Sequence, residues 1–432
     1  MKFVKLIVFS VILQAVCLGQ TWVPQSNPSP GVMFSVYAYS SNVAWASGEY
    51  GKVLYTSNGG VTWFNRSNAI FDSSNVLSIH GIDANTAICV CNVNGGKIFK
   101  STNQGLSWLT SYSRQSTVFT DIQFINSTTG FVFGNPTPAD VRYYIIKTTN
   151  AGATFDTTSV ARPTAPNINA QIMSNATYLL QPGVGGPVYI WFGTNDGKVF
   201  FSTNTGTSWQ SGTPQSNDPV LSITFVTTLN GYAGCQNPFF SNNGGLGWSM
   251  QGTLQNEGKF FAFDNVNGQL FYSTGPSIYH STNGGASYIR QYTNPSKEDF
   301  RDLSFVYTAA DDPRSVINGW GVTGDGILAK YTDPIGIITI STNVPAGYSL
   351  EQNFPNPFNP VTSISFDIPK KGFVTLAVYD ALGNLVKTIH NGELSAGSYK
   401  GDFDGNGYAS GVYFYRLQAG EFVQTKKMIL TK

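Results

Sequence analysis

The sequence predicts an all-β protein, a seven-bladed β-propeller followed by a small Ig-like β-sandwich. Three observations predict this fold: the composition, a recurring octapeptide, and a change of pattern near residue 333. Only 11% of the 432 residues are charged, 14% are aromatic, and 46 are glycines. This mixture favours short strands joined by tight turns, because glycine adopts left-handed backbone conformations without steric cost. The aromatic residues also supply enough apolar surface for a large core.

The N-terminus has the features of an export signal. Lys2 and Lys5 precede an apolar run at residues 6–16, and Cys17 and Gly19 are small residues where cleavage is expected. We therefore expect residues 1–19 to be a signal peptide. Its apolar run is too short to cross a bilayer, so no transmembrane span is expected after its removal. A lipoprotein acylated at Cys17 is the alternative, although the preceding QAV sequence fits a lipobox poorly.

An octapeptide with Ser or Thr first, Asn third, Gly fifth and an aromatic residue eighth organises most of the chain. Two examples are TSNGGVTW (56–63) and STNQGLSW (101–108). The third-position asparagines are residues 58, 103, 150, 204, 243 and 283, so they recur after 45, 47, 54, 39 and 40 residues. Such a length suits a four-stranded propeller blade. The residues assigned to these structural turns are Asn58, Gly60, Trp63, Asn103, Gly105, Trp108, Asn150, Gly152, Asn204, Gly206, Trp209, Asn243, Gly245, Trp248, Asn283 and Gly285.

Each octapeptide is expected to stabilise a turn between two strands of a blade. The hydroxyl and the Asn side chain can bond backbone groups of the turn. The fifth-position glycine supplies a left-handed conformation, and the aromatic ring packs into the sheet. A seventh unit has strand-like runs at 300–306, 319–323 and 327–331 but no octapeptide. Trp22 is expected to begin its missing strand and so to close the ring.

These octapeptides resemble the Asp-box, the bacterial neuraminidase repeat, with Asn at the usual Asp position. The longer repeat resembles the photosystem-assembly-factor-like propellers and covers residues 20–332. The resemblance implies a propeller fold, but one such scaffold carries unrelated functions.

The pattern changes after residue 332. Residues 333–346 are expected to be a linker, and residues 347–432 contain alternating strand-like segments typical of a small sandwich. This segment begins with LEQNFPNPFNP (350–360) and closely resembles the type A sorting domain of the type IX secretion system. The matching residues include Asn353, Pro355, Asn356, Pro357, Phe358, Gly411, Tyr413 and Lys427. The resemblance implies type IX machinery as a partner, and a secreted, extracellular or outer cell-surface location.

The candidate catalytic residues are Asp121 and Asp302. Alignment of the first strand of each repeat places them beside the central channel, at positions equivalent to Ser35, Ser78 and Ser222. Two carboxylates facing a cavity can serve as acid and base in glycoside cleavage. The alternative, which we favour, is that each aspartate bonds backbone at a strand start. Sialidase activity is disfavoured because no Arg-Ile-Pro precedes the first octapeptide.

No cofactor or metal is expected. The three histidines have no zinc-type spacing. Residues 402–407 resemble the start of a calcium loop, but Tyr413 stands where an EF-hand needs an acidic residue. With a net charge of +1 and no cluster of lysine or arginine, nucleic acid is an unexpected partner.

The sequence therefore favours a non-catalytic binding module at the cell exterior, with an unidentified glycan or protein ligand. Enzymatic activity stays open: a secreted polysaccharide or glycoside hydrolase is the alternative. A chaperone-like protein partner, by resemblance to the assembly factors, is a third hypothesis.

Overall fold

The computed structural model describes residues 21–214, 218–251, 257–259, 262–266, 269–281, 285, 287–308, 316–332, 338–341, 343–405 and 408–431. Two compact units contain them: Trp22–Asp333 forms one, and the other contains Pro334–Lys432. The expected signal peptide 1–19, the turn residue Asn283 and much of the expected linker 333–346 lie outside the described residues. Within the described part of the chain, no helix has the length and apolar character needed to cross a membrane.

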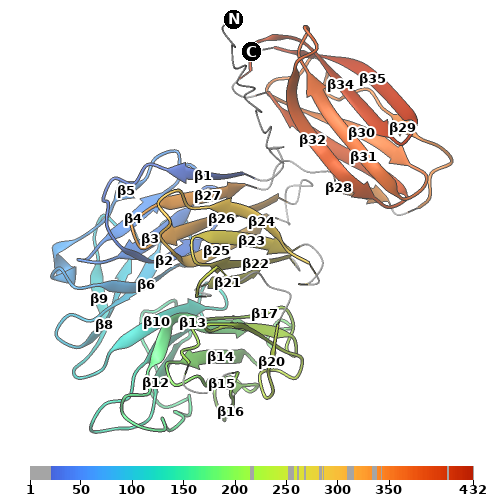
Figure 1. Cartoon of the computed structure of the whole chain (residues 1–432). Coiled ribbons are helices and arrows are strands. Elements are labelled where there is room, and N and C mark those ends of the chain that lie inside the picture. The colour runs from blue at the N-terminus through green and yellow to red at the C-terminus, as the bar shows by residue number, and fades with distance from the viewer. Residues whose placement is uncertain are drawn as a thin grey trace, which may run out of the picture. The chain divides into compact units, whose positions relative to one another are not determined.

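The Trp22–Asp333 unit consists of antiparallel sheets whose strands follow one another along the chain (Figure 1). The first sheets are β2 (Met33–Ala38), β3 (Ala44–Gly48), β4 (Val53–Thr56) and β5 (Phe64–Asn65); β6 (Val76–Gly81), β7 (Ala87–Cys91), β8 (Gly96–Ser101) and β9 (Leu109–Arg114); and β10 (Phe119–Phe124), β11 (Gly130–Gly134) and β12 (Tyr144–Thr148). Next come β13 (Ile172–Leu180), β14 (Tyr189–Thr194), β15 (Val199–Ser202) and β16 (Gln210–Gly212); β17 (Ser222–Phe225), β18 (Gly231–Gly234), β19 (Pro238–Ser241) and β20 (Ser249–Met250); and β21 (Ala262–Val266), β22 (Gln269–Thr274), β23 (Ser277–Ser281) and β24 (Ile289–Thr293). The last sheet contains β25 (Phe300–Thr308), β26 (Val316–Thr323), β27 (Leu328–Thr332) and β1 (Thr21–Gln25).

The first strands of successive sheets contact one another in a cyclic order. β2 contacts β6, β6 contacts β10, and the series continues through β13, β17 and β21 to β25, which contacts β2 again. Buried apolar clusters lie between neighbouring sheets, and one of them contains both Trp45 of β3 and Phe99 of β8. This cyclic stacking of sheets around common inner strands is the arrangement of a β-propeller.

The N-terminal strand β1 is a strand of the last sheet, beside β27. Trp22 is 5% exposed, and its ring packs against Tyr292, Phe300, Phe305 and Tyr331. Gln25 lies at the end of the same strand. Its side-chain oxygen accepts from the indole N–H groups of Trp320 in the last sheet and of Trp63, the last residue of the first octapeptide. The expected role of Trp22 in completing the last sheet agrees with this strand order.

The octapeptide turns share one hydrogen-bond pattern, shown here for residues 202–209. The Ser202 hydroxyl accepts from the Gly206 N–H at 2.9 Å, and the Asn204 side-chain oxygen accepts from the Ser208 N–H at 2.9 Å. Gly206 has φ +81°, a left-handed conformation that favours glycine. The same hydroxyl-to-glycine bond forms in the other five turns, between Thr56 and Gly60, Ser101 and Gly105, Thr148 and Gly152, Ser241 and Gly245, and Ser281 and Gly285.

We expect Ser202→Ala to lower the free energy of unfolding of this unit by about 1–3 kcal/mol, because it leaves the buried Gly206 N–H without its acceptor. All eight tryptophans lie between Trp22 and Trp320, so tryptophan fluorescence during urea unfolding reports on this unit alone. The matched control is Thr203→Ala at the exposed neighbouring position, which should change the free energy by less than about 0.5 kcal/mol. Equal effects of the two substitutions would contradict a stabilising role for the hydroxyl.

The third sheet has three strands, where the repeat length suggests four. Next to β12, an isolated bridge joins Lys147 to Asp156, and the Tyr143 N–H donates to the Pro163 carbonyl at 3.0 Å. The longest octapeptide spacing, 54 residues between Asn150 and Asn204, covers this segment. The inserted chain therefore bonds the edge of β12 without forming a regular strand.

The C-terminal unit contains two four-stranded sheets. One has the order β28 (Ile338–Ser341), β33 (Gly397–Asp404), β30 (Val361–Ile368) and β29 (Ser349–Leu350). The other has the order β32 (Leu385–Leu394), β31 (Gly372–Tyr379), β34 (Gly411–Ala419) and β35 (Phe422–Leu430). Alternate residues of β30 are buried, and the two sheets share one apolar core. Strand β28 lies inside the expected linker and pairs with β33.

Candidate functional site

Four inner strands carry a β-bulge at the same place, and each bulge is followed by a polar residue. The register shifts lie between Met33 and Ser35, Val76 and Ser78, Phe119 and Asp121, and Phe300 and Asp302. A bulge re-aims the side chain that follows it. Ser35, Ser78, Asp121 and Asp302 are thus structurally equivalent, as the sequence alignment predicts. Ser222, the fifth predicted position, is the first residue of β17 and pairs with Gly234.

A second layer of side chains lies two residues further along the inner strands. Its position is defined by the residue paired with it on the second strand of each sheet, and alternate residues of a strand face the same side. The members are Tyr37 (opposite Trp45), His80 (Ile88), Gln123 (Phe131), Tyr178 (Trp191), Thr224 (Tyr232), Asp264 (Phe271) and Ser304 (Trp320). The octapeptide repeat does not single out this layer. These residues can be found in the sequence by aligning the second strands of the repeats and taking the paired residue on each first strand. Where a first-layer residue was predicted, the second-layer residue stands two positions after it.

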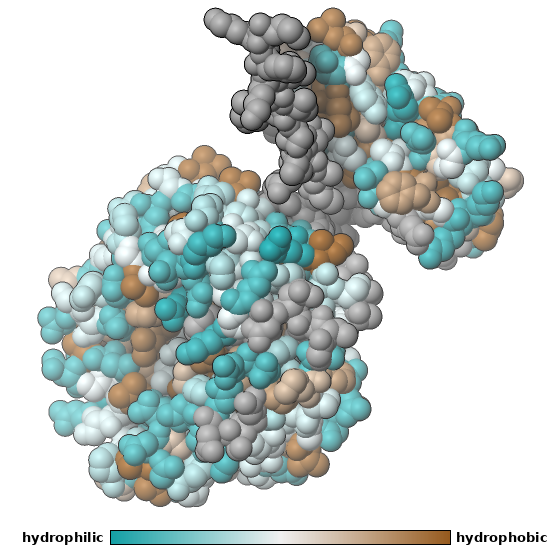
Figure 2. Space-filling view, viewed as in Figure 1, coloured by the Kyte–Doolittle hydropathy of each residue, from teal (hydrophilic) through white to brown (hydrophobic). Residues whose placement is uncertain are grey.

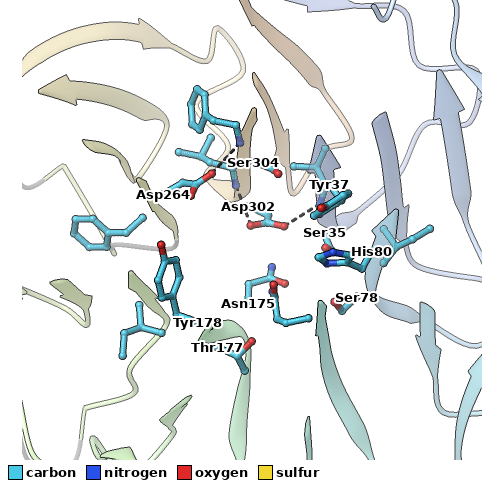
Figure 3. A pocket seen from close by; sticks show the side chains of 17 residues that line it. Ser35, Tyr37, Ser78, His80, Asn175, Thr177, Tyr178, Asp264, Asp302 and Ser304 are labelled. Atoms are coloured by element: carbon cyan, nitrogen blue, oxygen red, sulfur yellow. Dashed lines mark hydrogen bonds between the residues drawn. The ribbon is translucent and has the colours of Figure 1, made fainter. Parts of the chain in front are cut away.

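The inner strands surround a cavity of about 190 Å³ (Figure 3). Its polar lining consists of Ser35, Tyr37, Ser78, His80, Gln123, Asn175, Thr177, Tyr178, Asp264, Asp302 and Ser304, and its apolar lining of Val36, Ile79, Ile223, Phe263, Leu303 and Phe305. Every inner strand from β2 to β25 contributes at least one of these residues. None of the described residues that line the cavity is a lysine or an arginine.

Two carboxyl groups, Asp264 and Asp302, face this cavity, and both join neighbouring sheets. Asp302 Oδ2 accepts from the Val36 N–H at 2.9 Å, and its Oδ1 accepts from the Leu303 N–H at 2.9 Å. Asp264 Oδ2 accepts from the Phe305 N–H at 2.8 Å, and its Oδ1 from the N–H of the next residue at 2.8 Å. Each carboxyl group therefore bonds backbone of the following sheet as well as its own strand.

Burial favours the protonated form of these acids. It raises the pKa of Asp264 to about 7, although the two backbone N–H groups oppose the shift. Burial also raises the pKa of Asp302 well above its ordinary value, and the charges of Asp121 and Asp264 add to this effect. Around neutral pH the cavity can thus hold a carboxyl group that exchanges a proton.

Asp121 occupies the equivalent position on β10 but does not line the cavity. Its carboxyl group is fully buried and accepts from the Ser78 hydroxyl at 2.5 Å, the Thr177 hydroxyl at 2.6 Å and the Ile122 N–H at 2.8 Å. Burial raises its pKa, against the effect of these hydrogen bonds. Of the two aspartates predicted from sequence, only Asp302 lines the cavity, and the second carboxyl group there is that of Asp264.

Aromatic rings form part of the cavity wall. Tyr37 and His80, from β2 and β6, have ring centroids 3.8 Å apart. Burial lowers the pKa of His80 to about 3, so its imidazole is neutral at physiological pH. Burial raises the pKa of Tyr37 and of Tyr178 to about 12, with a further contribution from Asp264, so both phenols are protonated.

Asn175 lies in an irregular part of β13 between Ile172 and Thr177, where the register with β14 shifts. It adopts a left-handed conformation with φ +61°. Its side-chain N–H donates to the Phe34 carbonyl of β2 at 2.6 Å, and Figure 3 shows Asn175 between the inner strands. This bond joins two strands that are not neighbours in the cyclic order, so Asn175 obstructs the channel on the side of Phe34.

The outer surface of this unit offers no extended apolar face in the view of Figure 2, where apolar residues are scattered among hydrophilic ones. Large exposed apolar side chains such as Val61, Leu106 and Leu246 belong to the octapeptide turns. Scattered apolar residues of this kind are normal on soluble proteins and do not indicate a docking surface.

In the C-terminal unit, five of the expected sorting residues lie within the NFPNPF segment at 353–358. The Asn353 side chain donates to the Thr362 hydroxyl at 2.8 Å, and its backbone N–H donates to the Tyr415 hydroxyl at 2.8 Å. Asn356 accepts from the Ile429 N–H at 2.9 Å, and Phe358 is buried in the core. The other members are Pro355 and Pro357 in the same segment, Gly411 and Tyr413 on β34, and Lys427 on β35. The segment is therefore tied to the last two strands of the chain.

Comparison with known families identifies this C-terminal segment. Residues 352–431 match the family described as a secretion system C-terminal sorting domain. The match implies export by the type IX secretion system to the cell surface or the extracellular space. No curated protein matches the chain in sequence.

Solved structures similar to this chain are β-propellers. YCF48 bound to a D1 peptide has a TM-score of 0.54 and 14% identity, covering 72% of this chain and 96% of its own. YCF48 from Cyanidioschyzon merolae has a TM-score of 0.54 and 15% identity, covering 72% and 98%. The WD40 β-propeller domain of Doa1 has a TM-score of 0.53 and 11% identity, covering 73% and 97%. At these identities the comparison shows the fold alone.

Proposed function

We propose that the chain is an exported, non-catalytic binding module, in which a seven-bladed propeller binds its ligand and an Ig-like sandwich directs export. The observation that carries this proposal is the central cavity, which every inner strand helps to line and whose lining includes hydroxyl, amide, carboxyl and aromatic groups. Such a concave site with convergent polar groups is the usual form of a ligand site. The sheet order and the contact between β25 and β2 support a ring of seven blades.

The bonds of the cavity carboxyl groups favour binding over hydrolysis. Asp264 and Asp302 each hold the backbone of the next sheet. A general acid or base must be free to exchange its proton with substrate in a fixed geometry. These two carboxyl groups already accept hydrogen bonds that join neighbouring inner strands. Hydrolysis remains the second candidate because two carboxyl groups share one cavity, and one has a pKa of about 7.

The ligand is a glycan or a protein in this proposal. Tyr37 and Tyr178 offer ring faces, and Ser35, Ser78 and Ser304 offer hydroxyls. Aromatic faces pack against sugars and against protein side chains alike. The hypothesis of a chaperone-like protein partner rests on fold likeness to assembly-factor propellers alone.

The full chain should bind members of an array of extracellular polysaccharides and proteins without releasing reducing ends. Tyr37→Ala, which removes a ring from the cavity wall, should weaken that binding about tenfold or more, because aromatic anchors dominate such sites. The exposed Tyr50→Ala is the matched control and should bind as the parent does. Release of reducing ends that disappears in Asp302→Asn would replace binding by hydrolysis, and binding that survives Tyr37→Ala would move the site away from the cavity.

A further inference from the structure

The cavity contains acidic side chains without basic ones in its described lining. Asp264 and Asp302 both line it, while none of the described lining residues is a lysine or an arginine. Each of the four carboxyl oxygens accepts one of the backbone N–H groups described above. A carboxylate oxygen has two lone pairs, so these groups keep acceptor capacity beyond those bonds. A ligand that donates hydrogen bonds and carries positive charge would complement them.

His80 supplies a second, independent sign of a ligand. Its side chain is 5% exposed and lines the cavity, and burial alone shifts its pKa, with no hydrogen bond contributing to the shift. Figure 3 shows its nitrogens toward the cavity. A buried polar group usually has a partner, because an unsatisfied one costs about 1–3 kcal/mol. Tyr37, whose ring packs against that of His80, also lines the cavity.

The same lining argues for an organic cation over a metal ion. Among the described residues, no group of three or more His, Cys, Asp or Glu side chains comes together as a metal site would need. Aromatic rings instead line the cavity beside the carboxyl groups: Tyr37, Tyr178, Phe263 and Phe305. An ammonium group is attracted both to carboxylates and to the faces of aromatic rings.

We propose that the cavity binds a protonated primary amine, at the end of a lysine side chain of a protein ligand. The ammonium group donates to Asp264 and Asp302 and to the unprotonated ring nitrogen of His80. The aliphatic stem lies against Phe263, Phe305 and the ring of Tyr178, because lysine combines an apolar stem with a charged head. This inference rests on the proposed function, since it takes the cavity as the ligand site.

The test is calorimetric titration of the full chain at pH 8 with Nα-acetyl-lysine methylamide and with Nα-acetyl-norleucine methylamide, which lacks the amine. The lysine compound should bind at least about tenfold more tightly, and Asp302→Asn should remove most of that preference. The control Asp72→Asn removes an exposed charge of the same unit and should leave the preference unchanged. Equal affinity for the two compounds would overturn the inference.

A second measurement needs no variant. The titratable groups facing the cavity are Asp264, Asp302, His80, Tyr37 and Tyr178. The histidine is neutral and the tyrosines are protonated from pH 6 to 8.5, so only the aspartates titrate there. Amine binding at pH 6 should therefore release more protons than binding at pH 8.5, where Asp264 is already ionised, as measured by titration in buffers of different ionisation enthalpy. Binding without proton release at pH 6 would contradict contact with Asp264.

Two further ligands separate this inference from the proposed function. If glucosamine binds more tightly than the lysine compound, an amino sugar replaces lysine as the ligand. If N-acetylglucosamine binds as well as glucosamine, the cavity accepts a neutral sugar: the amine inference fails while the binding function stands. If none of these compounds binds, the amine inference fails, and the array of polysaccharides and proteins decides the binding function by itself.

Discussion

Trp22→Ala should lower the free energy of unfolding of the propeller by about 3–5 kcal/mol, the usual cost of removing a large buried aromatic side chain. Trp22 is 5% exposed and packs against Tyr292, Phe300, Phe305 and Tyr331. It also belongs to the strand that completes the last sheet, so its loss weakens the closure of the ring. Urea unfolding followed by the fluorescence of the other seven tryptophans measures the effect, since all of them lie in this unit.

The matched control is Val23→Ala on the same strand. Val23 is 54% exposed, so this substitution should change the free energy of unfolding by less than about 0.5 kcal/mol. A small effect at both positions would mean that β1 adds little to the propeller. A large effect at both would indicate that the loss of stability comes from the low β propensity of alanine in this strand and not from removal of the buried ring.

Asp264→Asn should stabilise the propeller relative to the parent chain progressively as the pH rises from about 4 to 7. Burial raises the pKa of Asp264 to about 7, against about 3.9 in an unfolded chain. Between these values the native state keeps a proton that the unfolded state loses, so the parent chain loses stability as the pH rises. The asparagine does not titrate and escapes this loss, which is at most about 4 kcal/mol because one pKa unit corresponds to about 1.4 kcal/mol.

The measured quantity is the change with pH of the stability difference between variant and parent. The amide has one oxygen for the two backbone N–H groups that Asp264 accepts, so a constant loss is superimposed on the pH effect. Because the parent and the variant share all other titratable groups, the difference between them cancels the titration of those groups. For the control Asp72→Asn, at an exposed position, this difference should not change with pH. A flat difference between pH 4 and 8 would show that Asp264 titrates normally.

The sequence predicted the features of the propeller that repeat along the chain. The glycine at the fifth octapeptide position adopts a left-handed conformation in all six turns. The hydroxyl two residues before Asn bonds the N–H of that glycine, so the turn is stabilised locally. The packing of Trp22 against the last repeat was also predictable. The seventh repeat lacks its fourth strand, and the residues around Trp22 resemble the fourth strand of the other repeats. Such features depend on the local backbone geometry of a turn and on the number of strands in each repeat.

The composition of the cavity depends on contacts between strands far apart in the sequence. Asp121 was expected beside the channel, but hydroxyls of Ser78 and Thr177, from two other strands, bond and cover its carboxyl group. Asp264 was missed because β21 pairs with β22 without the bulge that marks the other aspartates. The position of Asn175 follows from an irregular strand start that no repeat anticipates.

The pairing of β1 with the last sheet sets the order in which the propeller can be completed. Residues 21–25 are made roughly 300 residues before their partner strand β27. Pairing over such a separation forms late, because the intervening chain must first be brought together. While a nascent chain emerges, its first strand waits unpaired until Leu328–Thr332 is available. The sorting domain follows β27 in the chain, so the ring can close only after the chain has been made almost to the segment that directs export.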